Sequence, residues 1–138
     1  MSTSALALLG FSVWTLALLL TIGLLRVALT VSRKRAPNSF SPQGDDVSPF
    51  SARLCRAHAN CYESFPIFGG LLLLALVSDL THLTDGLAFI ALAARIAQSV
   101  VHLVSTSSLA VQIRFAFFAV QVGIWIYWAY RLAGALTA

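Results

Sequence analysis

Four polar side chains recur at helical spacing in an otherwise apolar part of the sequence: they are Arg53, Arg56, Asn60 and Glu63. Separations of three, four and three residues place all four on one stripe of a helix. Guanidinium groups bind carboxylates and phosphates, and the amide adds hydrogen-bonding groups of both kinds. The stripe is therefore a candidate site for an anionic ligand.

A second polar stripe has the same spacing, because Arg95, Gln98 and His102 follow one another at three and four residues. Counted from the expected starts of their helices, Glu63 and Arg95 each lie about 15–18 Å along the axis, at similar depth. The simplest interpretation is a buried ion pair that fixes the two helices against each other, with nothing bound.

That ion pair would leave several polar groups of the same region unexplained: these are Arg53, Arg56, His58, Asn60, His102 and Arg114. The three arginines among them have no acidic partner in the pattern, and an anionic ligand would supply the missing charge. Arg131 lies about 25 Å beyond Arg114 on the same helix, so these two arginines should lie at opposite interfaces of the membrane. The long side chain of Arg131 would extend toward water there.

The amino-acid composition indicates whether these polar stripes lie in a soluble or in a membrane protein. Of 138 residues, 59% are hydrophobic and 10% are charged, against roughly 25% charged in soluble domains. These proportions exclude a soluble domain, a disordered chain and a disulfide-stapled secreted module. They predict a single membrane domain that covers residues 1–138.

The net charge of +4 does not indicate nucleic acid, because the basic run Arg33–Arg35 directly follows an apolar segment. A run in that place is typical of a cytoplasmic flank that contacts anionic lipid headgroups. We therefore expect membrane lipids as partners and no nucleic acid. Cys55 and Cys61 lack the spacing of a zinc site, so we expect neither a metal nor a disulfide.

Hydrophobic segments predict an all-α fold, an integral membrane bundle of four helices. The helices cover residues about 5–32, 50–80, 86–104 and 109–133, with a loop at about 33–49. Ser48 or Ser51 would cap the second helix, and Pro66 would kink it. The fourth helix would end near Gly134. The connection between the second and third helices is too short for a crossover, so these two helices should be antiparallel.

Basic residues near the membrane predict the orientation. Five of them flank the first loop: Arg33, Lys34, Arg35, Arg53 and Arg56. Arg131 stands on the opposite side, so we expect the loop to be cytoplasmic and both termini to lie on the non-cytoplasmic side. The abundance of Ala and Leu favours a bacterial inner membrane.

Three stretches of the sequence resemble the MAPEG family, the membrane-associated proteins in eicosanoid and glutathione metabolism. Residues 53–68, RLCRAHANCYESFPIF, resemble the family's signature on its second helix. Residues 94–102, ARIAQSVVH, are similar to its third helix, and Arg114 with Phe118 to its fourth. The similarity extends over nearly the whole chain.

The resemblance implies a left-handed four-helix bundle that assembles as a homotrimer. Glutathione, the co-substrate, would bind between neighbouring subunits in the cytoplasmic half, and a lipophilic second substrate would enter from the bilayer. The implied glutathione-binding residues are Arg53, Arg56, His58, Asn60, Glu63, Arg95, Gln98, His102 and Phe118.

Within that set, the resemblance gives the residues of the second helix different roles. Arg53 and Arg56 would bind the carboxylates of glutathione. Asn60 and Glu63 would bind its polar backbone and its amine, and His58 would line the same wall.

Arg114 is implied as the catalytic residue, and Arg95 would orient Glu63. A guanidinium group beside the glutathione sulfur favours the thiolate, which is the nucleophile, and remains protonated itself. The expected activity is glutathione transfer to lipophilic electrophiles, together with peroxidase activity from the same thiolate.

The sequence also departs from the family pattern and leaves alternatives open. Gln98 and His102 stand where eicosanoid-forming members often carry Tyr, which argues against a leukotriene or prostaglandin synthase. A non-catalytic member could hold glutathione or an anionic lipid in the same arginine site. A small multidrug exporter could use Glu63 to exchange protons, although the surrounding arginines argue against it.

Overall fold

The computed structural model describes residues 2–137 as an all-helical chain. Its elements are α1 Thr3–Val31, α2 Pro49–Val77, the short 3-10 helix η1 Thr81–Leu83, α3 Asp85–Val104 and α4 Ser108–Thr137. Each of the four α-helices is long and apolar enough to cross a membrane. The predicted all-α class with four membrane-spanning helices is confirmed.

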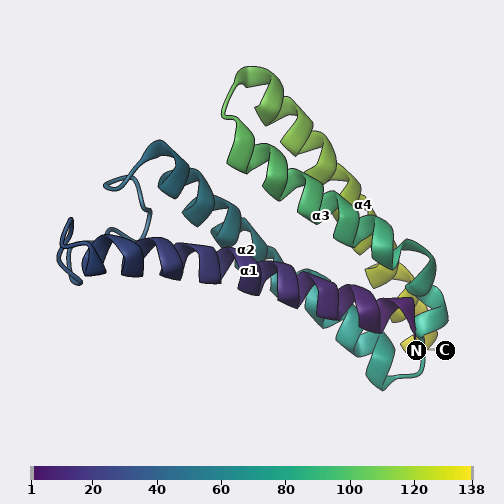
Figure 1. Cartoon of the computed structure of the whole chain (residues 1–138). Coiled ribbons are helices and arrows are strands. Elements are labelled where there is room, and N and C mark those ends of the chain that lie inside the picture. Colours follow the sequence, from purple (N-terminus) through teal and green to yellow (C-terminus); the bar gives the residue numbers. More distant parts are fainter. Residues whose placement is uncertain (1, 138) are drawn as a thin grey trace.

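The helices form two antiparallel hairpins, α1 with α2 and α3 with α4 (Figure 1). The hairpins meet at the end of the molecule where both termini lie, and they diverge toward the other end. The loop before α2 and the turn between α3 and α4 lie at that diverging end. Both termini are therefore on one side, as the sequence predicted, and the assignment of that side to a compartment stays a prediction.

The core is formed by residues of all four α-helices. Phe11 stacks on Phe68 with 4.6 Å between ring centroids, and Phe68 lies 6.1 Å from Trp128. The same cluster includes small buried residues, among them Ala57 and Ala88. Small side chains let membrane helices approach closely enough for van der Waals contact to stabilise them.

The N-terminus of α1 is held by the start of α3. The amide of Ser4 donates to the Asp85 carboxylate at 2.8 Å, and the Thr3 hydroxyl donates to the Asp85 carbonyl at 2.8 Å. The hydroxyls of Ser4 and Thr84 also lie 2.7 Å apart. The first turn of a helix has amides without partners inside the helix, so these bonds satisfy α1 and fix it to α3.

The observed ends of α2 and α4 differ in part from the boundaries predicted from the sequence. Ser48 is the cap of α2, because its hydroxyl accepts from the amide of Ser51 at 3.0 Å. The helix continues through Pro66 and ends at Val77 rather than residue 80. The predicted end of α4 near Gly134 is wrong, since the helix continues to Thr137. A glycine inside a helix costs about 1 kcal/mol, and neighbouring Ala and Leu favour continuation.

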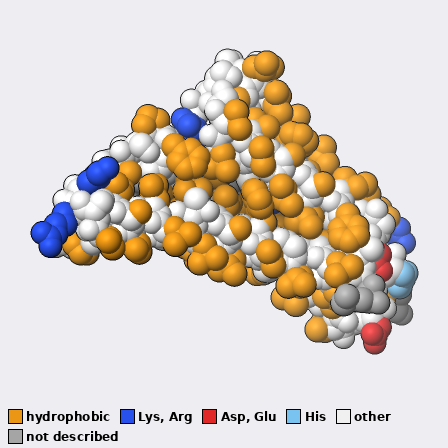
Figure 2. Space-filling view, in the orientation of Figure 1, with side chains coloured by type: hydrophobic (Ala, Val, Ile, Leu, Met, Phe, Trp, Pro, Cys, Tyr) orange, Lys and Arg blue, Asp and Glu red, His pale blue; other side chains and the backbone are white. Residues whose placement is uncertain are grey.

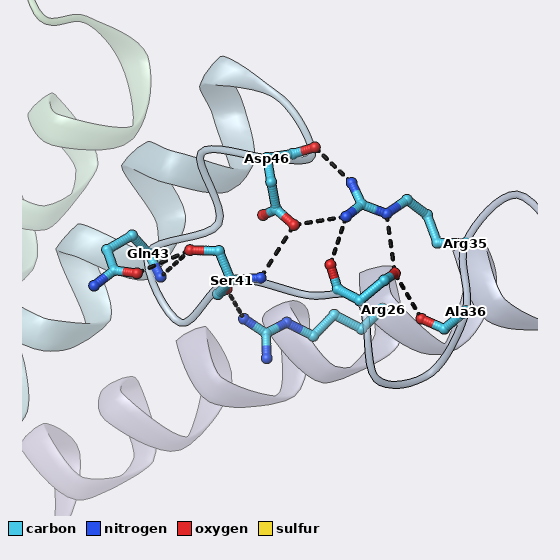
Figure 3. A network of polar contacts seen from close by, with 7 residues as sticks. Arg26, Arg35, Ala36, Ser41, Gln43 and Asp46 are labelled. Carbon is cyan, nitrogen blue, oxygen red and sulfur yellow. Dashed lines mark hydrogen bonds and ion pairs between the residues drawn. The ribbon is translucent and has the colours of Figure 1, made fainter.

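A polar network orders the loop between α1 and α2 (Figure 3). The Asp46 carboxylate pairs with the Arg35 guanidinium at 2.7 Å and accepts from the amide of Ser41 at 3.0 Å. The amide of Ser41 and the guanidinium of Arg35 lower the pKa of Asp46 below its ordinary value, because both favour the charged form. Gly44 adopts a φ of 70° and packs tightly against the start of α2.

Candidate functional site

A cavity of about 670 Å³ lies between α2 and the hairpin of α3 and α4. Its polar lining consists of Asn60, Glu63, Ser64, Arg95 and Gln98, which lie at the middle of α2 and α3 or on the side of it nearer the diverging end. Its remaining wall is apolar and includes Ile67, Leu74, Trp125 and Ile126, with Phe118 next to the polar part. The cavity therefore has a polar end and an apolar end.

A smaller cavity of about 210 Å³ adjoins the polar end. Asn60, Gln98 and Phe118 line both cavities, and the smaller one adds Arg114 from the first turns of α4. The inner residues of the two predicted stripes thus come together with the arginine of α4 in one region, although they belong to three helices.

Arg114 is half-buried and contacts Nδ1 of the buried His102. A guanidinium group only donates, so a hydrogen bond between these groups requires Nδ1 of His102 to be the acceptor. The Nε atom of Arg114 is buried and has no hydrogen-bond partner within residues 2–137. The Nε–H group of Arg114 can therefore donate a hydrogen bond to an acceptor on a ligand.

Arg95 is 2% exposed, and its guanidinium carbon lies 5.9 Å from the centroid of the Phe11 ring. Its Nε is also without a partner among the described residues. The predicted ion pair with Glu63 is not formed: the salt bridge found within residues 2–137 joins Arg35 to Asp46. Glu63 lies on an exposed face of α2, whereas Arg95 points inward toward α1.

The first turns of α2 contribute less to the cavities than the resemblance implied, because Arg53, Arg56 and His58 are absent from their linings. Nε of Arg53 donates to the carbonyl of Leu103 at 2.9 Å, near the C-terminus of α3, where a cation is favourable. Arg56 is exposed. The ring of His58 packs edge-on against Tyr62, 5.4 Å away.

Arg53 nevertheless lies near Arg114 at the end of α3. It bonds the carbonyl of Leu103, the residue after His102, and Arg114 contacts His102 itself. An anion near His102 would therefore interact with both guanidinium groups.

Gln121 is a polar residue of this region to which the sequence assigned no role. It is 0% exposed, and its Nε2 donates to Oε1 of Gln98 and to the carbonyl of Phe117, each at 2.9 Å. A signal was present in the sequence, because Arg114, Phe118 and Gln121 are separated by four and three residues, the spacing of one helical stripe.

The described residues contain no cluster of three or more His, Cys, Asp or Glu side chains that could hold a metal ion. Cys55 and Cys61 are free thiols, and both are buried. The polar groups of the site are arginines, amides, the carboxylate of Glu63, the hydroxyl of Ser64 and one histidine.

Comparison with known proteins places this arrangement in a family. No curated protein and no solved structure gives a significant match to the chain. The family model described as the MAPEG family matches residues 4–134. Together with four apolar helices of spanning length, this match shows that the chain is an integral, multi-pass membrane protein that belongs to the MAPEG family.

Proposed function

We propose that this protein is a membrane-embedded glutathione transferase that activates the glutathione thiol for attack on lipophilic electrophiles. One observation carries the proposal: a cavity with a polar, cationic end beside Arg114 continues into an apolar end. A water-soluble peptide thiol suits the polar end, and a lipophilic molecule from the bilayer suits the apolar end.

The polar end has the donors that glutathione requires. Glutathione carries two carboxylates and one ammonium group, so it needs more cationic than anionic partners. Arg95 and Arg114 each have a buried Nε without a partner among the described residues, and Glu63 provides an acid for the ammonium group. Asn60 and Gln98 can bind the peptide groups.

Arg114 is the residue proposed to favour the thiolate. A fixed guanidinium group in a site of low dielectric constant stabilises the anion, while the thiol proton leaves to water. The thiolate then attacks an electrophilic carbon in the apolar end, where the carbon–sulfur bond forms and the leaving group departs. With a hydroperoxide, the same thiolate attacks oxygen, and a second glutathione completes the reduction to alcohol, water and glutathione disulfide.

The proposed assembly is a homotrimer with glutathione bound between neighbouring subunits. Arg56 and Glu63 are exposed on the single chain, as are the cavity residues Ile67 and Phe118. A neighbouring subunit would cover this side and enclose the ligand. Native mass spectrometry of the detergent-solubilised protein tests the assembly, and a monomer under conditions that retain glutathione binding would contradict it.

The function is tested by titrating the purified protein with glutathione while recording the ultraviolet absorption of the thiolate. We expect Arg114→Ala to bind glutathione, to give no thiolate signal, and to conjugate a chloronitrobenzene about 10²–10³ times more slowly. Arg131→Ala is the matched control, because its arginine is exposed near the opposite end of α4 and should leave turnover unchanged. Unchanged turnover in Arg114→Ala would contradict the assigned role.

The same titration separates the transferase from a non-catalytic protein that holds glutathione or an anionic lipid. Such a protein would bind through the unpartnered guanidinium groups of Arg95 and Arg114. Saturable binding without thiolate formation in the wild-type protein would favour this second function.

A further inference from the structure

A second cavity, of about 400 Å³, lies under the loop at the C-terminal end of α1. Its lining includes Arg26, Val27, Thr30 and Val31 from the last turns of α1, and Asn38 and Phe40 from the loop. None of these residues lines the cavities beside Arg114. This second cavity therefore requires an explanation of its own.

Arg26 is fixed in the wall of this cavity. Its Nη2 donates to the carbonyl of Ser41 at 2.9 Å, and its guanidinium carbon lies 5.5 Å from the centroid of the Phe40 ring. Figure 3 shows the side chain rising from α1 to meet the loop. Both contacts leave the positive charge of Arg26 without an acidic partner, and no ion pair of Arg26 occurs in residues 2–137.

The charge around the cavity is positive. Asp46 is paired with Arg35, which leaves Arg26, Arg33 and Lys34 against Asp45. Three cations and one acid give a local net charge of +2. Figure 2 shows Lys and Arg side chains gathered at this tip of the molecule.

An apolar path leads from the cavity toward the middle of the membrane. Leu24, Val27 and Val31 are spaced by three and four residues, so they lie on one stripe of α1, and they are 69%, 58% and 77% exposed. Val27 and Val31 belong to the cavity lining, and Leu24 continues the stripe toward the centre of α1. A cationic cavity at the end of a membrane-spanning helix is thus continuous with an exposed apolar stripe.

We propose that this cavity binds one anionic phospholipid. Its phosphate would interact with Arg26 and receive hydrogen bonds from the amide of Asn38 and the hydroxyl of Thr30. One acyl chain would lie along Val27 and Leu24. A free phosphate would use only the polar half of this site, whereas a phospholipid uses both halves, which is why we assign the site to a lipid.

Native mass spectrometry tests the proposal by counting the lipids bound to the detergent-solubilised full chain. The probes are phosphatidylglycerol and phosphatidylcholine with identical acyl chains. We expect the wild-type protein to prefer phosphatidylglycerol. Arg26→Gln should weaken phosphatidylglycerol binding about fivefold and leave phosphatidylcholine binding unchanged, since one basic residue near a membrane surface contributes on that order.

Two further variants keep the test decisive. Val27→Trp fills the cavity while leaving the bond from Arg26 to Ser41 in place, so it should also lose phosphatidylglycerol even if Arg26→Gln disturbs the loop. Arg33→Gln is the control, because it also removes one positive charge from this end of the molecule, but Arg33 does not line the cavity. It should change phosphatidylglycerol binding less than twofold.

Several outcomes would overturn the proposal. Equal binding of the two lipids by the wild-type protein would show no preference for an anionic headgroup. Equal losses in Arg26→Gln and Arg33→Gln would show diffuse attraction to the basic tip. Displacement of the lipid by soluble glycerol phosphate at similar concentration would show a free phosphate site. None of these measurements depends on glutathione.

Discussion

The contact between His102 and Arg114 determines how freely the guanidinium group of Arg114 can move. His102 is buried in the last turn of α3, and its Nδ1 is the partner found for Arg114 within the described residues. His102 is therefore a positioning residue for the proposed catalytic arginine.

Replacing His102 should change turnover more than binding. We expect His102→Leu to lower kcat for conjugation about 10- to 100-fold with little change in glutathione affinity, because a hydrogen bond to a charged group contributes roughly 1.5–3 kcal/mol. His102→Gln retains an acceptor and should recover part of the rate. The measurement is steady-state kinetics beside a glutathione titration, and an unchanged kcat in His102→Leu would contradict the role.

At the residue scale, the sequence predicted which helical stripes carry polar groups but not how those stripes face each other. Asn60, Gln98 and Arg114 line one cavity, although Arg56 and Glu63 of the same α2 stripe are exposed on the single chain. The expected pairing of Glu63 with Arg95 fails, since spacing along one helix does not determine the rotation of that helix relative to its neighbour. Rotation depends on the packing of side chains such as Phe11, which lies beside Arg95.

Among the elements, the loop between α1 and α2 depends on one glycine. Gly44 has a φ of 70°, and a Cβ atom there would lie 2.7 Å from Sγ of Cys55 and 2.7 Å from Oγ of Ser51. An L side chain at this position would combine an unfavourable backbone conformation with steric overlap against α2.

Gly44→Ala should therefore destabilise the loop by about 1–2 kcal/mol. Hydrogen exchange of the loop amides at neutral pH measures the effect, and faster exchange around Ser41 is the expected result. Gly23→Ala is the matched control, because a Cβ atom in that turn of α1 meets nothing within 4 Å. Equal exchange in the two variants would contradict the importance of Gly44.

At the element scale, the number and order of the helices could be predicted because membrane-spanning segments need long apolar runs. Their ends were less predictable. Asp79 and Arg33 both adopt a φ of 56° just after a helix, so ordinary residues take the place that glycine usually occupies. Gly134, by contrast, lies within α4.

At the scale of the whole molecule, the aromatic core holds the two hairpins together. Phe68 is buried between Phe11 of α1 and Trp128 of α4, so it connects helices of both hairpins. Truncating it would leave a void where the hairpins join.

We expect Phe68→Ala to lower the free energy of unfolding by about 3 kcal/mol, through lost packing contacts around the void. Phe89→Ala removes the same side chain from an exposed face of α3 and should have little effect. Thermal unfolding in detergent compares the two variants. Similar midpoints for both would mean that this aromatic cluster does not hold the hairpins together.

The arrangement of the hairpins could be predicted only in part. The short connection between α2 and α3 predicted that these helices are antiparallel, and four spans predicted that both termini lie on one side, as Figure 1 shows. The divergence of the hairpins, and with it the cavity, could not be predicted, because the spacing of residues along single helices does not determine the angle at which the hairpins pack. The proposed trimer concerns surfaces that a single chain leaves exposed, and it stays a prediction.

The bonds between Asp85 and the first turn of α1 have a consequence for biogenesis. The amide of Ser4 is capped by a residue 81 positions later in the chain. Asp85 is synthesised after the whole of α1 and α2, so the amide of Ser4 gains this partner only late in translation, whereas the amide of Ala5 has the hydroxyl of Ser2 beside it from the beginning. The earliest helix is thus among the last to complete its hydrogen bonds.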